Sequence, residues 1–329
     1  MRSSCGRLFT RKSFCIGGEA AVANIRDIAK LTGYSVSTIS RVINGHPYVD
    51  EEKRKEILAV MKEVDYIPNA KARQLSYGKT KSIGVILPYT NHPYFDQLIS
   101  GIIEEAFDYD YKVTLLPTGY QKEKERSYLE EFAAKAFDGL IITSRANTLE
   151  DLLDYQKYGP LVFCEEIKEK QASCVFIDRE QSITEGLSYL KQQGVKRLGI
   201  TLGRSGRLSY NSKITLQLCR RLFPFFDESL VFWDCIDAEK GKQAGIFFKD
   251  HRVDGVFTNS DMVAAGILQS YLQDKVPVVV IGRDNLLISE LLGFPTIDHH
   301  LEACGEMAFQ LFLTEKKDKV KIPYTFIQR

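Results

Sequence analysis

Apolar strand segments alternate with helical patterns from residue 82 to the end of the chain, and no other feature limits the possible folds so strongly. Buried strands that are joined by helices form parallel sheets with helical crossovers. Because the strands are too many for one sheet, we predict an α/β body of two doubly wound parallel-sheet subdomains over 82–329. The predicted strands cover residues 83–87, 113–116, 139–142, 161–163, 175–177, 198–201, 256–258 and 278–281.

The segment before this body contains three short helical patterns. The first begins near Ile25 and ends at Gly33, and a turn at residues 44–47 follows the second. Ser35 and Asp50 can cap the second and third helices with their side-chain oxygens. Two short helices joined by a tight turn and followed by a third helix are typical of the helix-turn-helix. We therefore predict a small all-α DNA-binding domain over 22–68.

The distribution of charge supports this division. Residues 22–81 hold eleven lysines and arginines against seven acidic residues, whereas the chain beyond residue 81 is net acidic. This asymmetry indicates a basic module that is attached to a body without its own affinity for DNA.

Two motifs, in the right order, carry a family resemblance. Residues 25–45, IRDIAKLTGYSVSTISRVING, closely resemble the headpiece signature of the LacI/GalR family of bacterial regulators. Residues 66–75, YIPNAKARQL, resemble the hinge helix of that family, and the similarity extends through nearly all of 22–329. The resemblance implies a helix-turn-helix headpiece over 22–68, a hinge helix and linker over 69–81, and an effector-binding and dimerisation core over 82–329. That core is expected to resemble periplasmic binding proteins.

The second helix of the headpiece is expected to lie in the major groove of DNA, with its first residues against base edges. Val36 and Ser37 head its exposed face, and Arg41 lies one turn after Ser37. By the resemblance these three determine specificity. A guanidinium can bind guanine bidentately, which is worth about 1–3 kcal/mol of discrimination, so Arg41 is the favoured reader.

Four further residues of this region carry hydroxyl or amide groups suited to phosphate contacts: Ser35, Thr38, Ser40 and Asn44. Structural alternatives remain open for two of the candidate DNA contacts: Ser35 could serve only as a helix cap, and Val36 could serve only to pack the turn.

In the hinge, the resemblance assigns DNA contacts to Asn69, Ala72 and Leu75. An eight-residue helix does not persist alone in water, so we expect DNA to order it, with Leu75 wedged between base pairs of the minor groove. Packing of Leu75 against the body is the alternative.

The sequence contains no catalytic or metal-binding pattern. Residues 203–206 fall one residue short of a nucleophile elbow, the five histidines form no HExxH, and no glycine-rich phosphate loop follows a strand. The seven cysteines are scattered without CxxC spacing, as in a protein with reduced thiols. We therefore predict that the chain is not an enzyme and uses no cofactor or metal. Because no apolar run approaches eighteen residues, we also predict no membrane segment.

By the resemblance, an effector binds between the two subdomains, near the carboxyl ends of the strands. Matching motifs give eight candidate contacts: Tyr94, Phe95, Ser144, Asp178, Lys213, Ser260, Asp261 and Asp284. Asp284 suits a sugar because a carboxylate accepts two hydroxyl hydrogen bonds. Lys213 replaces an arginine that many relatives have, and lacks its bidentate fork. Asp178 supports either the crossover or the ligand. Arg204 and Arg207 favour an anionic effector such as a phosphorylated sugar, with solvated surface charge as the alternative.

These observations predict a cytoplasmic homodimer, with a tetramer left open, that binds a palindromic DNA operator and represses a carbohydrate-utilisation operon. A sugar or sugar phosphate is the predicted effector. Control by a protein corepressor is one alternative. An exported sugar-binding receptor is another, and it would need a signal peptide and no headpiece. Residues 1–21 have too short an apolar core for a signal peptide, so we predict a non-structural extension before a translation start at Val22.

Overall fold

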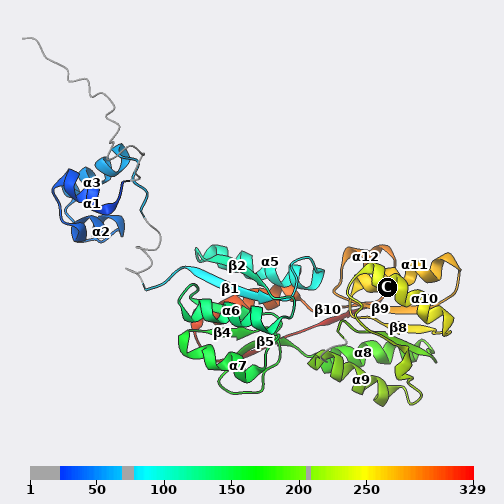
Figure 1. The fold of residues 1–329 in the computed structure, drawn as a ribbon. Helices are drawn as coiled ribbons and strands as arrows, with labels where there is room; N and C mark the ends of the chain where they lie inside the picture. The colour runs from blue at the N-terminus through cyan, green and yellow to red at the C-terminus, as the bar shows by residue number, and fades with distance from the viewer. Residues whose placement is uncertain (1–22, 69–77, 205–208) are drawn as a thin grey trace, which may run out of the picture. The chain divides into compact units, whose positions relative to one another are not determined.

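The computed structural model describes residues 23–68, 78–204 and 209–329. The chain divides into two compact units, one ending at Thr80 and the other beginning at Lys81 (Figure 1). Several predictions lie outside the described residues: the extension over 1–21, the role of Arg207, and the hinge contacts of Asn69, Ala72 and Leu75.

The described part of the first unit contains three helices, α1 (Ile25–Thr32), α2 (Val36–Ile43) and α3 (Glu51–Glu63). Asn24 caps α1, and Gly33 ends it in the left-handed conformation at φ 72°. Ser35 caps α2 and Asp50 caps α3, as the sequence predicts. The three helices share one core, and its buried residues are Ile28, Ile39, Val42, Ile57 and Met61.

The second unit begins with a six-stranded sheet in the order β11-β5-β4-β3-β1-β2, in which all pairs are parallel. Helices α5 and α13 cover one face of this sheet, and α6 and α7 cover the other. The strands are β1 (Ser82–Leu87), β2 (Lys112–Pro117), β3 (Gly139–Ile142), β4 (Leu161–Phe163), β5 (Ser173–Ile177) and β11 (Lys319–Ile322). The helices are α5 (Pro93–Asp108), α6 (Lys122–Ala133), α7 (Leu149–Leu153) and α13 (Leu301–Thr314), with a 3₁₀ turn η1 (Asp154–Tyr158).

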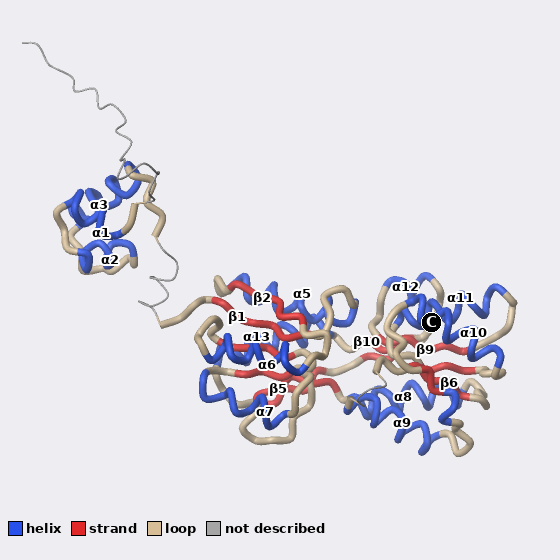
Figure 2. The backbone as a smooth tube through the Cα atoms, in the orientation of Figure 1, coloured by secondary structure: helices blue, strands red, loops and turns tan. Residues whose placement is uncertain are grey.

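The second sheet has the order β12-β10-β9-β8-β6-β7, and only its β10–β12 pair is antiparallel. Helices α8 and α9 cover one face, and α10 and α11 cover the other (Figure 2). The strands are β6 (Leu198–Thr201), β7 (Val231–Phe232), β8 (Gly255–Phe257), β9 (Val279–Arg283), β10 (Thr296–Asp298) and β12 (Thr325–Ile327). The helices are α8 (Arg179–Gln192), α9 (Tyr210–Leu222), α10 (Ala238–Asp250), α11 (Asp261–Gln273) and α12 (Leu287–Leu291), with a 3₁₀ turn η2 (Glu228–Leu230).

This arrangement confirms the predicted fold class, a helix-turn-helix headpiece followed by two doubly wound subdomains. In the described part of the second unit the chain passes between the subdomains after β5, after β10 and after β11. Asp178 lies at the first passage and His299 at the second. No helix among the described residues is long and apolar enough to cross a membrane.

Candidate nucleic-acid interface and ligand cavity

Helix α2 presents its polar side to solvent. Ile39 and Val42 are buried in the headpiece core, whereas Ser37 and Arg41 are exposed and Val36 is 41% exposed. The guanidinium of Arg41 has no ion pair with any other described residue, so it is available to an external acceptor. An α-helix with such a face fits the major groove of DNA.

The other predicted DNA contacts surround this face. The Oγ atom of Ser35 accepts the backbone N–H of Thr38 at 3.2 Å, so Ser35 is a helix cap whatever else it contacts. Thr38, Ser40 and Asn44 are half-buried, and the Asn44 amide donates to Ser40 Oγ at 3.4 Å. These groups lie beside the exposed face, and they remain candidates for phosphate contacts.

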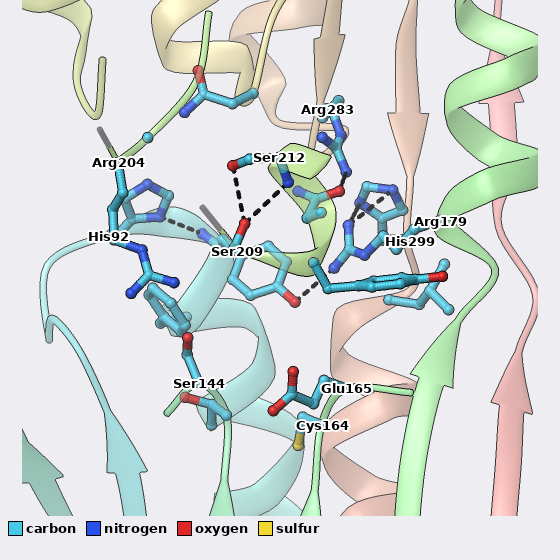
Figure 3. Close-up of a pocket in the computed structure, with 18 of the residues that line it drawn as sticks. His92, Ser144, Cys164, Glu165, Arg179, Arg204, Ser209, Ser212, Arg283 and His299 are labelled. Carbon is cyan, nitrogen blue, oxygen red and sulfur yellow. Dashed lines mark hydrogen bonds between the residues drawn. The ribbon is translucent and has the colours of Figure 1, made fainter. Parts of the chain in front are cut away.

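A cavity of about 240 Å³ lies between the two subdomains of the second unit (Figure 3). Many of its lining residues follow the carboxyl ends of strands in both sheets, as is usual for open parallel sheets, and others lie at the starts of α5 and α9. From the first subdomain they include Tyr89, Tyr120, Ser144 and Glu165, and from the second they include Arg204, Asn259 and Asp284. The guanidinium of Arg204 lies 3.7 Å from the centre of the Tyr120 ring.

Four of the eight predicted effector contacts line this cavity: Tyr94, Phe95, Ser144 and Asp284. The rings of Tyr94 and Phe95 contact each other with centroids 5.0 Å apart. The Asp284 carboxylate is 2% exposed, and its Oδ2 atom has no hydrogen-bond partner among the described residues. A buried oxygen without a partner is the expected state of a group that awaits a ligand.

The other four predicted contacts are not among the residues that line this cavity. Asp178 caps α8 by accepting the Gln181 N–H and pairs with Lys321 Nζ at 2.7 Å, and both contacts favour a supporting role at the crossover. Ser260 caps α11 by accepting the Val263 N–H. Asp261 is fully buried, with both carboxylate oxygens already bonded. Lys213 is exposed on α9, because the helix turns it away from Asn211 and Ser212, which do line the cavity.

Sequence reasoning missed a cluster of basic groups formed by Arg179, Arg283 and His299. The Arg179 Nη2 atom donates to Tyr94 Oη at 2.8 Å, and its Nη1 atom lies 3.3 Å from the His299 ring nitrogens. Arg283 donates to Asn211 Oδ1 at 3.5 Å. Arg283 and Arg179 directly adjoin the predicted Asp284 and Asp178, so their positions at strand ends were the available signal.

The cluster is expected to make stability depend on pH. Burial, followed by the charges of Arg179 and Arg283, lowers the pKa of His299 well below its usual 6.5. As the pH falls below 6.5 the unfolded chain binds a proton that folded His299 does not, so the free energy of unfolding falls by up to about 1.4 kcal/mol per pH unit. Denaturant unfolding of His299→Gln and the parent between about pH 7.5 and pH 5.5 tests this. The variant should lose less stability on acidification, and identical pH slopes would contradict the assignment.

Comparison with known proteins matches both units. Residues 24–69 match the model of bacterial regulatory proteins of the lacI family, and residues 80–329 match that of periplasmic binding proteins and the sugar binding domain of the LacI family. Catabolite control protein B of Bacillus subtilis (strain 168) is 42% identical over 307 residues, which cover 93% of this chain and 99% of that protein.

Two solved structures share the fold at low sequence identity. The lac repressor dimer bound to operator and the anti-inducer ONPF has a TM-score of 0.78 at 19% identity, covering 94% of this chain and 98% of its own. A LacI family regulator from Lactobacillus casei with bound sucrose has a TM-score of 0.68 at 21% identity, covering 75% and 98%.

Proposed function

Because the chain belongs to the LacI family of bacterial regulatory proteins, and is a DNA-binding transcription regulator rather than an enzyme, we propose that it represses a carbohydrate-utilisation operon. A sugar or sugar phosphate bound in the cavity between the subdomains controls its affinity for the operator. The carrying observation is the solvent-facing side of α2, where Val36, Ser37 and Arg41 are exposed above a buried core. Such a regulator acts on DNA in the cytoplasm.

The DNA contacts divide into two kinds. Val36, Ser37 and Arg41 meet base edges, and Ser35, Thr38, Ser40 and Asn44 bind phosphates and fix the register of the helix in the groove. Asn69, Ala72 and Leu75, which lie outside the described residues, complete the interface through the minor groove.

We propose a homodimer on a palindromic operator. Large apolar side chains are exposed along α5 and α12, among them Phe107, Leu287 and Leu291. These helices lie along one long side of the second unit (Figure 1). Such a surface suits a two-fold interface, in which each patch meets its own copy. The structural neighbour bound to operator is a dimer.

Leu291→Glu is expected to weaken self-association by at least about tenfold, since each of two symmetric copies loses the burial of a leucine that is 71% exposed in the single chain. Analytical ultracentrifugation over a concentration series measures this. Leu58→Glu, at an exposed leucine of α3 in the headpiece, is the matched control and should leave the dimer intact. Equal association of Leu291→Glu and the parent would place the interface elsewhere.

Control by ligand follows from the position of the cavity. A molecule that contacts both subdomains favours their closed arrangement, and closure alters the ends of the body from which the two hinges of a dimer emerge. Reciprocity requires operator DNA to change the affinity for the effector by the same factor. Tyr94, Phe95, Ser144 and Asp284 are the proposed contacts for a sugar body.

The test is a gel-shift titration of the full chain on a palindromic site, with and without a panel of sugars and sugar phosphates. We expect salt-dependent, sequence-selective binding and a change of affinity with at least one member of the panel. Failure to prefer any palindrome over random duplex at matched salt would overturn the proposal.

A second candidate keeps DNA binding but replaces the sugar by a protein corepressor. It is favoured by the 42% identity to a protein named for catabolite control. Indifference of operator binding to every sugar and sugar phosphate would favour this candidate. The headpiece argues against the exported receptor, which would not need one.

A further inference from the structure

The proposed effector cavity holds two arginines that no acidic side chain neutralises directly. Arg179 and Arg283 donate to neutral groups, which are the Tyr94 hydroxyl, the His299 ring and the Asn211 amide oxygen. Among the described residues neither guanidinium has an ion pair with a carboxylate. Figure 3 shows Arg179, Arg283 and His299 together on one side of the cavity.

Arg283 is the more unusual of the two. It is 3% exposed, and its Nε atom has no hydrogen-bond partner among the described residues. Burial and then the charge of Arg179 lower the pKa of Arg283 to about 9, so the cation is kept at neutral pH against its surroundings. Buried cations are normally paired, because an unpaired buried charge is costly. An external anion would supply the missing partner.

The acidic residues of the cavity do not fill this role. Glu165 is paired with Arg145, at 2.5 Å between Nε and Oε1, and lies apart from the arginine pair (Figure 3). Glu166 is exposed to solvent. Asp284 is close in sequence to Arg283, but it forms no ion pair with that arginine and its Oδ2 atom is unpartnered. A neutral sugar would leave both guanidinium groups without a direct ion pair.

We propose that the effector is an organic oxyanion, a carbohydrate-sized molecule whose phosphate or carboxylate is held between Arg179 and Arg283. Guanidinium groups bind both of these anions bidentately, which suits a fixed pair of arginines. The aromatic rings of Tyr94 and Phe95 and the hydroxyl of Ser144 are left for the neutral body of the ligand. The inference rests on the proposed function, and it assigns the charged group to residues that the sequence analysis did not single out.

Calorimetric titration of the full chain tests this with matched probes: hexoses, their monophosphates, and the corresponding sugar acids. At least one phosphate or acid should bind about tenfold or more tightly than its parent sugar. Comparison of the sugar phosphates with the sugar acids shows whether the bound oxyanion is a phosphate or a carboxylate. If a neutral sugar binds as tightly as its charged derivatives, the charge inference fails and the proposed function stands. If nothing in the panel binds, both the anion and the small-molecule effector fall, while operator binding stands.

Variants locate the anion. Arg283→Gln and Arg179→Gln should each weaken binding of the charged probe by about 10- to 100-fold and leave the parent sugar little affected. Arg252→Gln removes an exposed arginine outside the cavity and is the matched control. Arg283→Lys keeps the positive charge but loses the planar guanidinium that donates two hydrogen bonds, so it should retain part of the affinity for the charged probe. It serves as the second variant if Arg283→Gln fails to fold. Equal affinities for Arg179→Gln and Arg252→Gln would overturn the assigned position.

Discussion

Arg41→Ala is expected to remove operator preference while leaving binding to random duplex DNA nearly intact. One bidentate contact between arginine and guanine is worth about 1–3 kcal/mol, and the proposed dimer would make it twice. The free-energy difference between specific and nonspecific binding should therefore fall by about 2–6 kcal/mol. Nonspecific affinity comes from phosphate neutralisation, which most of the other basic groups still provide. Fluorescence anisotropy on the operator and on a scrambled duplex, across a salt series, measures both quantities.

The control for this prediction is Lys62→Ala, which removes one exposed positive charge from α3 rather than from α2. It should leave the ratio of specific to nonspecific affinity unchanged. If Arg41→Ala weakens binding equally on every duplex, Arg41 is a phosphate contact and the reader must be sought elsewhere on α2. If Arg41→Ala changes neither the operator affinity nor the ratio of specific to nonspecific affinity, the exposed face of α2 does not contact DNA.

The elements that the sequence predicted best are those whose burial is settled locally. Strands such as β1 and β3 are buried on both faces, so each appears in the sequence as a continuous apolar run. The headpiece helices were found because their caps are encoded next to their apolar positions, as with Ser35 before α2. In both cases short-range chemistry and tertiary packing favour the same structure.

The strands that the sequence missed depend on partners that are distant in the chain. Strand β7 has two residues, and β11 is an edge strand in which Lys319 and Lys321 alternate with apolar side chains. Strand β12 pairs antiparallel with β10, a contact that no local pattern encodes. Their strand conformation is decided by the hydrogen bonds of the neighbouring strand, which the local sequence does not specify.

The residues of the candidate cavity were also hard to predict where they depend on contacts between distant parts of the chain. Four of the eight predicted contacts line the cavity, and these include both aromatic residues but only one of the three aspartates. The arginine pair was not found because Arg179 starts a helix after one passage between subdomains and Arg283 ends β9, and only the fold brings both beside His299. Likewise, Asp261 and Asp284 are similar in sequence context. Only their hydrogen bonds distinguish the structural carboxylate of Asp261 from the proposed ligand contact of Asp284.

That distinction predicts a large loss of stability for Asp261→Ala. The Asp261 carboxylate accepts the Thr296 hydroxyl at 2.6 Å and the Leu286 N–H at 2.7 Å, and so ties α11 to β10 and to the loop before α12. Removing it leaves the buried Thr296 hydroxyl and the partly buried Leu286 N–H without this acceptor, and it leaves a cavity at the fully buried position of Asp261. The free energy of unfolding should fall by about 3–5 kcal/mol, as measured by denaturant unfolding.

Asp284→Asn is the matched change and should behave in the opposite way. Burial and then the charge of Asp261 raise the pKa of Asp284 well above its usual value, so a neutral amide of the same shape removes an unfavourable charge. Its unpartnered Oδ2 atom loses no contact within the protein, and the unfolding free energy should stay within about 1 kcal/mol of the parent. Binding of the effector should instead weaken by tenfold or more, since a hydrogen bond from a sugar hydroxyl to a charged acceptor is worth about 1.5–3 kcal/mol. A variant as unstable as Asp261→Ala, with unchanged ligand affinity, would make Asp284 a structural residue and remove the sugar contact from the proposed site.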